Sequence, residues 1–329
     1  LRDQEVVAWH EHVIGGNISS SFNSASSVGS NQITISSHGY STGDAVVYDA
    51  AGGEVVGGLT DGQTYFVYVV DSNTISLAAS VAQSEIGAVI TLADASSAST
   101  QFLKQDAKVE TVISIPGTNE DELWMVVQRT VDGATRRYVE VLTPKFDTFR
   151  GSTKVGSVFV DSSLTYDGTA TSTLSGLDHL EAETVSILGD GSVHADRAVS
   201  SGAITSISPT VTRASVGLPY TSTLKTLRPE KGGDDGSAQG RPKRVFETTF
   251  RFLDTLGAEY APGTSTSFDT VQFREGSTPM DISPALFSGD KTVQFHGSWE
   301  TEGQVQVRQT QPLPFELTSI VTRIVTHSG

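Results

Sequence analysis

Apolar and polar residues alternate in short runs along the whole chain. The runs are rich in Val, Ile, Thr, Phe and Tyr, and Gly, Asp, Asn and Ser separate them. Such runs predict β-strands joined by tight turns. Very few stretches place apolar residues three and four positions apart over ten or more residues, which is the spacing that an amphipathic helix requires. The pattern therefore predicts an all-β fold.

Residues 17–103 differ from the rest of the chain in charge and composition. They contain seven acidic residues and no Lys or Arg, and Ser-rich stretches lie at both ends. Polar flexible flanks around a compact patterned block are typical of an inserted module. Within it, Asp71-Ser72-Asn73 predicts a tight hairpin. The strands expected here are Gln32–Ser36, Ala45–Tyr48, Thr64–Val70 and Thr74–Leu77.

The residues on either side of this block, 1–16 and 104–150, form a second predicted group. They give four strand-like runs, with turns at Pro116-Gly117-Thr118-Asn119 and Asp132-Gly133. A four-stranded antiparallel meander of this length is the unit of a β-propeller blade. We therefore expect one blade-like sheet with the 17–103 module inserted between its first and second strands. Those strands are Val6–Ile14, Val109–Ile115, Leu123–Arg129 and Arg136–Leu142.

The region 151–329 is predicted to be a β-sandwich or a partly open barrel, because short strands recur at regular spacing. Its expected hairpin turns are Asp190-Gly191, Ser201-Gly202 and Ser288-Gly289-Asp290. A glycine-rich loop, residues 231–240, divides the region. The expected strands are Ser157–Asp161, Glu183–Leu188, Ala203–Ile207, Ala214–Val216, Val245–Leu253, Thr270–Phe273, Val293–Gly297, Val305–Gln309 and Leu317–Thr326.

Charge and composition narrow the function classes. The chain has 38 acidic and 22 basic residues, a net charge of −16 and a pI near 4.7, which argues against nucleic-acid binding through a general basic field. It has no cysteine, which excludes disulfides, zinc–thiolate sites and thiol nucleophiles. No apolar run approaches the roughly 20 residues of a membrane helix. The chain begins at Leu1 rather than Met, which favours a piece of a longer polypeptide.

Two patterns are candidates for metal binding. His10 and His12 lie two apart on a predicted strand, so both imidazoles face one side. No third ligand has a recognisable spacing, and a polar strand face or a subunit contact explains the pair equally. Asp61-Gly62 and Asp190-Gly191-Ser192 resemble fragments of calcium loops but lack the full spacing, so we interpret them as hairpin turns. We predict no metal site and no cofactor.

One cluster, Asp178-His179-Leu180-Glu181-Ala182-Glu183, is a candidate for acid–base chemistry. A glycosidase needs two carboxylates across a sugar cleft, which sequence spacing alone does not establish. The cluster also lies at the start of a predicted strand, where polar residues are common without any catalytic role. A Ser-His-Asp triad lacks specific support, because a chain with this many serines always offers a chance assignment. We therefore predict no catalytic residues and a chain that is not an enzyme.

One local basic stretch stands out in this acidic chain. It flanks the glycine-rich loop and is a candidate contact for phosphates or for an acidic neighbouring subunit. A solvated loop is the alternative. The proposed contact residues are Lys231, Arg241, Lys243 and Arg244, with Lys225, Arg228 and Arg251 beside them.

Several separated motifs resemble one known family. They are Trp9–His12, Lys108–Val112, Asp121–Val127, Arg137–Leu142, Leu164–Gly168, Ser175–Glu181 and Val216–Tyr220. In this order they resemble the tail tubular protein B, or tail nozzle, family of short-tailed bacteriophages and related prophage tail proteins. The resemblance covers residues 1–16 and about 104–260.

The inserted segment resembles a different module. His38–Asp44, Gly58–Tyr65 and Val69–Ala78 are similar to the small β-barrel named after the first catalytic cysteine half-domain of ubiquitin-activating enzymes. That module decorates phage and bacterial surface proteins. Because this chain has no cysteine, the resemblance implies no ubiquitin chemistry.

The first resemblance implies a structural protein of the virion. It implies a hexameric ring at the distal end of a phage tail, next to tail adaptor and tail fibre or spike proteins. DNA would pass through its channel during ejection without specific binding, and an acidic wall suits that passage because it repels phosphates.

Two alternatives stay open at this point. One is a tail protein that binds a host-surface glycan or receptor through the inserted barrel, with Tyr40 as the candidate contact. Tyr65 and Tyr68 are expected to pack within strands instead. The other alternative is a polysaccharide depolymerase, which would need a carboxylate pair among Asp178, Glu181 and Glu183.

Overall fold

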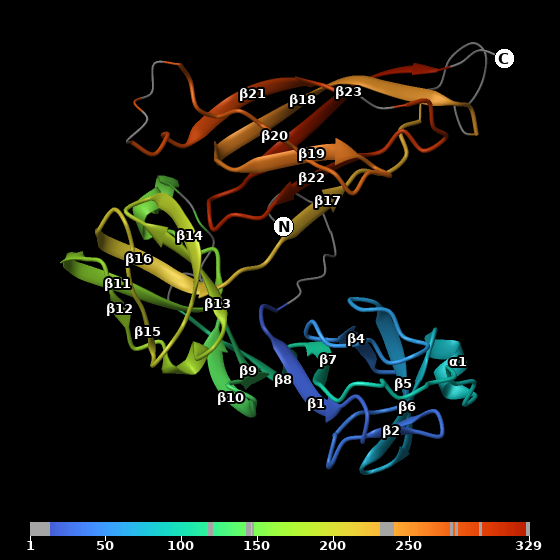
Figure 1. Cartoon of the computed structure of the whole chain (residues 1–329). Helices are drawn as coiled ribbons and strands as arrows, with labels where there is room; N and C mark the ends of the chain where they lie inside the picture. The colour runs from blue at the N-terminus through green and yellow to red at the C-terminus, as the bar shows by residue number, and fades with distance from the viewer. Residues whose placement is uncertain are drawn as a thin grey trace. The chain divides into compact units, whose positions relative to one another are not determined.

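The computed structural model describes residues 14–117, 121–142, 146, 148–230, 240–276, 279, 282–295 and 298–326. The chain forms two compact units, Val13–Leu142 and a second unit built mainly from Thr143–Gly329. Antiparallel sheets joined by turns make up both units, which confirms the predicted all-β fold (Figure 1). In the described part of the chain, no helix has the length and apolar character needed to span a membrane.

A seven-stranded antiparallel sheet forms most of the first unit. Its strand order is β1-β7-β4-β5-β6-β3-β2, and one short helix, α1 (Val81–Glu85), follows β6. The strands are β1 (Asn17–Asn23), β2 (Val28–Gly29), β3 (Gln32–Thr34), β4 (Ala45–Asp49), β5 (Thr64–Asp71), β6 (Thr74–Ala78) and β7 (Thr100–Asp106). Alternate residues point into one core that includes Tyr48, Val67, Ile75, Leu77 and Leu103.

The hairpin predicted at Asp71-Ser72-Asn73 is confirmed. Strand β5 ends at Asp71 and β6 begins at Thr74, and the backbone N–H of Asn73 donates to the Asp71 carboxylate at 2.8 Å. An Asp side chain that accepts from the backbone two residues on is an Asx turn, the local chemistry that made this position recognisable.

A separate three-stranded sheet completes the first unit. Its order is β10-β9-β8, with β8 Lys108–Ile115, β9 Glu122–Val131 and β10 Ala134–Val141 (Figure 1). The predicted turn Asp132-Gly133 joins β9 to β10 with φ values of 49° and 68°, the left-handed pair that a two-residue hairpin needs. The strand predicted at Val6–Ile14 lies almost entirely outside the described residues.

The base of this three-stranded sheet is tied to β1 through buried polar groups. Arg129 on β9 is 1% exposed. Its Nε donates to the Gly15 carbonyl at 2.7 Å, and its terminal nitrogens form a bidentate pair with Glu140 on β10. The backbone N–H of Ser19 donates to Thr130 Oγ1 at 2.8 Å. These contacts hold the base of the sheet to Gly15 and β1.

The second unit contains two groups of sheets. The first group, the β11–β16 module, has a four-stranded sheet of order β11-β16-β13-β14 and a small pair β12-β15. Its strands are β11 (Asp161–Thr171), β12 (Leu174–Ser175), β13 (Thr184–Gly189), β14 (Ser192–Ala198), β15 (Ala203–Ile204) and β16 (Val211–Leu218). Leu177, Leu180, Val185 and Ile187 lie in its core.

The second group, the β17–β23 module, packs two sheets of orders β17-β22-β19-β20 and β21-β18-β23. Its core is rich in aromatic residues, with Phe250, Phe252 and Phe295 buried and Tyr260 and Phe273 packed against them. The strands are β17 (Ser222–Lys225), β18 (Lys243–Thr255), β19 (Ala258–Pro262), β20 (Asp269–Thr270), β21 (Phe287–Gln294), β22 (Val305–Gln309) and β23 (Leu317–Thr326).

Three sequence predictions for this unit are wrong. Ser288-Gly289-Asp290 was expected to turn but lies within β21, because it pairs along β18 and Asp290 forms an ion pair with Arg251 at 2.7 Å. The strand expected at Ser157–Asp161 begins only at Asp161, since a 3-10 turn precedes Ser157 and Ser157 Oγ donates to the Lys154 carbonyl. Of Thr270–Phe273, only Thr270 is in a strand.

Arg129→Met is expected to lower the free energy of unfolding by about 3 kcal/mol, because it leaves Glu140 without its partner in a largely buried site. Arg137→Met is the matched control: Arg137 makes the same bidentate contact with Glu110, but its side chain is 58% exposed. We expect the control to lose far less stability. Urea denaturation followed by circular dichroism measures both, and equal losses would contradict this account.

Gly58→Ala is expected to destabilise the first unit by more than about 2 kcal/mol. Gly58 has a φ of 91°, and an added Cβ would collide with the Thr91 carbonyl oxygen. Gly62→Ala is the control, because Gly62 has a φ of 75° but open space around it. It should cost only the backbone strain, about 1 kcal/mol. The difference between the melting temperatures of the two variants measures the cost of the collision at Gly58 apart from the backbone strain. Similar melting temperatures would contradict the predicted collision.

Candidate functional site

The expected surface contact at Tyr40 is wrong. Tyr40 is 7% exposed, its hydroxyl donates to the Leu103 carbonyl at 3.3 Å, and burial raises the pKa of its phenol. Its backbone N–H donates to His38 Nδ1, and His38 Nε2 lies 2.8 Å from the Asp71 carbonyl. The ring therefore belongs to the module core and is unavailable for stacking on a sugar. Tyr65 is buried as well, as expected.

Lys243, expected as a contact residue, is also buried. It is 1% exposed, and its Nζ donates to the Pro229 carbonyl at 3.2 Å. Its backbone exchanges two hydrogen bonds with Glu300. A partner that needs an exposed cation cannot reach it, so this part of the prediction is wrong.

The remaining basic residues divide into paired and exposed groups. Arg228 forms an ion pair with Glu302, and Arg251 with Asp290. Arg244 is exposed on β18 and Arg241 is half-buried, while Lys231 lies outside the described residues. Two of the four predicted contact residues, Arg241 and Arg244, therefore remain as candidates.

Side chains of the cluster at 178–183 form hydrogen bonds with backbone groups of neighbouring loops. The two carboxylate oxygens of Glu181 accept from the N–H groups of Ser201 and Gly202 at 2.8 and 2.7 Å. His179 Nε2 lies 3.0 Å from the Ser162 carbonyl. This arrangement supports loops, and the described geometry places no carboxylate pair across a cleft.

Asp190-Gly191 is a hairpin turn, as predicted, whereas Asp61-Gly62 is a turn within the longer β4–β5 connection, where the Gln63 N–H donates to the Thr60 carbonyl at 3.2 Å. The Asp190 carboxylate accepts from the Thr212 N–H and hydroxyl and from the Arg213 N–H at 2.8–3.0 Å. Burial raises the pKa of Asp190, but these hydrogen bonds outweigh it and hold the pKa below its usual value. Asp61 accepts from the Ala50 N–H. Within the described residues, no three His, Asp or Glu side chains are placed to share a metal; His10 and His12 lie outside them.

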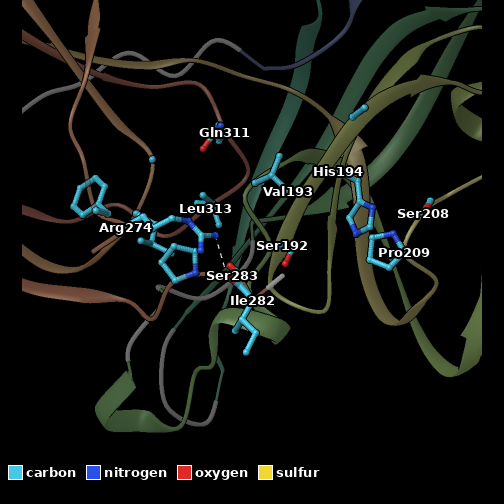
Figure 2. Close-up of a pocket in the computed structure, with 15 residues that line it drawn as sticks. Ser192, Val193, His194, Ser208, Pro209, Arg274, Ile282, Ser283, Gln311 and Leu313 are labelled. Atoms are coloured by element: carbon cyan, nitrogen blue, oxygen red, sulfur yellow. Dashed lines mark hydrogen bonds between the residues drawn. The ribbon is translucent and has the colours of Figure 1, made fainter. Parts of the chain in front are cut away.

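A cavity of about 730 Å³ lies in the second unit, between the β11–β16 and β17–β23 modules (Figure 2). Its described lining contains no Asp or Glu. The residues that line it are Ser192, Val193, His194, Ala195, Ser208, Pro209, Leu256, Gly257, Phe273, Arg274, Ile282, Ser283, Pro284, Gln311 and Leu313. The lining thus lacks the carboxylate pair of a glycosidase.

The polar groups at this cavity are used for contacts within and between the two modules. Within the β17–β23 module, Arg274 donates to the carbonyls of Pro279 and Ile282, the second of these at 2.9 Å (Figure 2). Lys154 Nζ donates to Ser283 Oγ and to the Pro284 carbonyl, and burial lowers the pKa of its ammonium. Leu188, Leu256 and Leu313 add a small apolar cluster. The cavity is best described as a module junction.

The most unusual surface of the chain is the three-stranded sheet of β8, β9 and β10. Residues directly opposite each other on paired strands point to the same side of a sheet. Ile113, Trp124 and Val141 are opposite one another, and so are Val126 and Val139. With Ile115, these residues define one side, which we call the Trp124 face. Val139 is 71% exposed and Ile113 is 59% exposed.

The other side of the same sheet is also apolar. Leu123 is opposite Leu142 through the hydrogen bond from the Leu142 N–H to the Leu123 carbonyl, and Val112 is opposite Met125. We call these four residues the Leu142 face. Leu142 is 54% and Val112 52% exposed. An antiparallel sheet that faces water on one side normally has a polar residue pattern on that side, so two exposed apolar sides make this sheet a candidate contact surface.

Charges around these faces are mostly neutralised within the sheet. Arg137 pairs with Glu110, which lowers the pKa of that carboxyl, and Arg129 pairs with Glu140. Glu122 accepts from Trp124 Nε1 at 2.9 Å at the edge of the Trp124 face. A partner covering either face would therefore bury few unpaired charges, whose desolvation opposes binding.

Lys243→Ala is expected to destabilise the second unit by about 2 kcal/mol, because it removes a buried aliphatic stem that packs closely against Gly303. The packing is tight: a Cβ added at Gly303 would lie only 2.9 Å from Lys243 Cδ. The neighbouring Arg244→Ala, on the exposed side of β18, should change stability by less than about 0.5 kcal/mol. Urea denaturation followed by circular dichroism measures both losses. A Lys243→Ala variant as stable as Arg244→Ala would contradict the burial of Lys243 and restore the original prediction.

The comparisons with known proteins leave the family open. No protein-family model matches the chain, and no curated protein matches it.

Proposed function

We propose that this chain is a structural component of a bacteriophage tail, of the nozzle class, and forms part of a ring-shaped conduit for DNA ejection. The observation that carries the proposal is the β8–β10 sheet with apolar residues exposed on both of its faces. A blade that is packed on both sides by neighbouring blades has this pattern, because radial repetition covers both faces. Three of the motifs that resemble nozzle proteins, Lys108–Val112, Asp121–Val127 and Arg137–Leu142, lie on these same strands.

The electrostatics support passage of DNA without binding. Four basic residues of the described sheets, Arg129, Arg137, Arg251 and Arg308, are paired with carboxylates of the same chain. The net charge of −16 then leaves an acidic surface that repels phosphates. A wall of this kind allows a polyanion to slide past, whereas exposed arginines would hold it through counterion release.

The two alternative functions have weaker support. Glycan binding through Tyr40 loses its contact residue because that ring is buried. A depolymerase would need a carboxylate pair, and both Glu181 carboxylate oxygens accept backbone hydrogen bonds. The proposal therefore places the chain in the virion, with other copies, a tail adaptor and tail fibre or spike proteins as partners.

The mass of the particle in solution tests the proposal. Native mass spectrometry should detect a closed oligomer near six copies, about 209 kDa for six chains of 34.8 kDa. Because the exposed sheet faces are apolar, the oligomer should survive 0.5 M salt, where surface ion pairs are screened. A monomer at all concentrations would contradict assembly by this chain, and cleavage of a bacterial surface polysaccharide would favour the depolymerase instead.

A further inference from the structure

Resting on the proposed ring, we infer that the β8–β10 sheet is itself the contact between copies: the Trp124 face of one copy packs on the Leu142 face of the next. The partner is a second copy of this chain. Three observations select this arrangement, namely the position of both faces on one end of the sheet, their different composition, and the pairing of the nearby charges.

The two faces expose their apolar residues at the same end of the sheet. The base is buried, with Val127, Arg129, Thr130 and Val131 all inaccessible. The free end carries Ile113, Val139 and Val141 on one side and Val112, Leu123 and Leu142 on the other. One neighbour can cover only one side of this end, so two neighbours are needed.

The faces differ, which decides the symmetry of the contact. A two-fold dimer would pair Trp124 face with Trp124 face and leave the Leu142 face in water. Packing unlike faces repeats from copy to copy and covers both sides of every sheet with a single kind of contact. Heterologous contacts of this type generate rings when the rotation closes.

The charges on the sheet are compatible with burial in such a contact. The Leu142 face contains Glu140 on the row of Val112 and Met125, and Arg129 neutralises it. On the Trp124 face, Arg137 lies at the end of the apolar area and is neutralised by Glu110. A copy carrying a net charge of −16 can therefore approach another through a patch with little net charge of its own.

Complementation between two single variants tests the inference. Val139→Glu places a charge on the Trp124 face, and Leu142→Glu places one on the Leu142 face. Both side chains are more than half exposed, so both variants should fold, as circular dichroism will verify. Ile86→Glu is the control, since Ile86 is exposed at the C-terminal end of α1 in the same unit. Light scattering reports the mass of each protein alone and of the mixed variants.

We expect the wild type and Ile86→Glu to assemble and each face variant alone to stay at the mass of one chain. Mixing the face variants should give a particle of two chains and no larger, because each partner retains one intact face and the two intact faces are complementary. Dimers of Leu142→Glu alone would indicate a two-fold contact and overturn the inference.

The remaining outcomes are equally decisive. Face variants that assemble like the wild type would overturn the inference while leaving the proposed ring in place. Face variants that stay monomeric after mixing would overturn the pairing of unlike faces. A monomeric wild type would overturn both the contact and the ring.

Discussion

The hydrophobic effect at the β8–β10 sheet is the constraint on which this account depends. Apolar side chains on one side of a sheet are normally buried by the protein's own core. Here Val139 and Ile113 point to one side and Val112 and Leu142 to the other, and all four are more than half exposed. Arg129 holds the base of the sheet to the rest of its unit, because its Nε donates to the Gly15 carbonyl while its terminal nitrogens pair with Glu140 on the neighbouring strand; the free end carries apolar residues on both sides. In the proposed ring, a neighbouring copy on each side would remove this apolar surface from water.

Ion pairs between neighbouring strands are a second feature of the sheets. Arginines of the described sheets are matched by carboxylates one strand away, as in the pairs Arg251–Asp290 and Arg308–Glu259. These pairs fix the register between strands and leave few exposed cations. The excess of acidic residues then gives a surface that disfavours polyanions. In the proposed ring, association between copies would depend on apolar contacts that salt does not screen, so the assembly would hold together and yet release DNA.

Local chemistry made much of the fold predictable from sequence. The strands Val305–Gln309 and Leu317–Thr326 have their predicted bounds, and the turns at Asp132-Gly133 and Asp190-Gly191 have the left-handed backbone that their residues favour. Long-range packing was not predictable. Tyr40 is buried because Leu103, 63 residues away, accepts its hydroxyl, and Lys243 because Pro229 and Glu300 enclose it. The alternation in β8 and β10 indicated strands, but only the assembled sheet shows that no described neighbour covers either side of the free end.

Site-directed cross-linking tests the central claim most directly. Because the chain contains no cysteine, a thiol-specific reagent modifies only the cysteines that are introduced. A double variant, Val139→Cys with Leu142→Cys, is treated with a short bis-maleimide and separated on a denaturing gel. The account predicts a ladder of linked chains that ends at the number of copies in the ring, and mostly single chains from either single variant. Dimers as the largest product, or efficient linking by Val139→Cys alone, would contradict it.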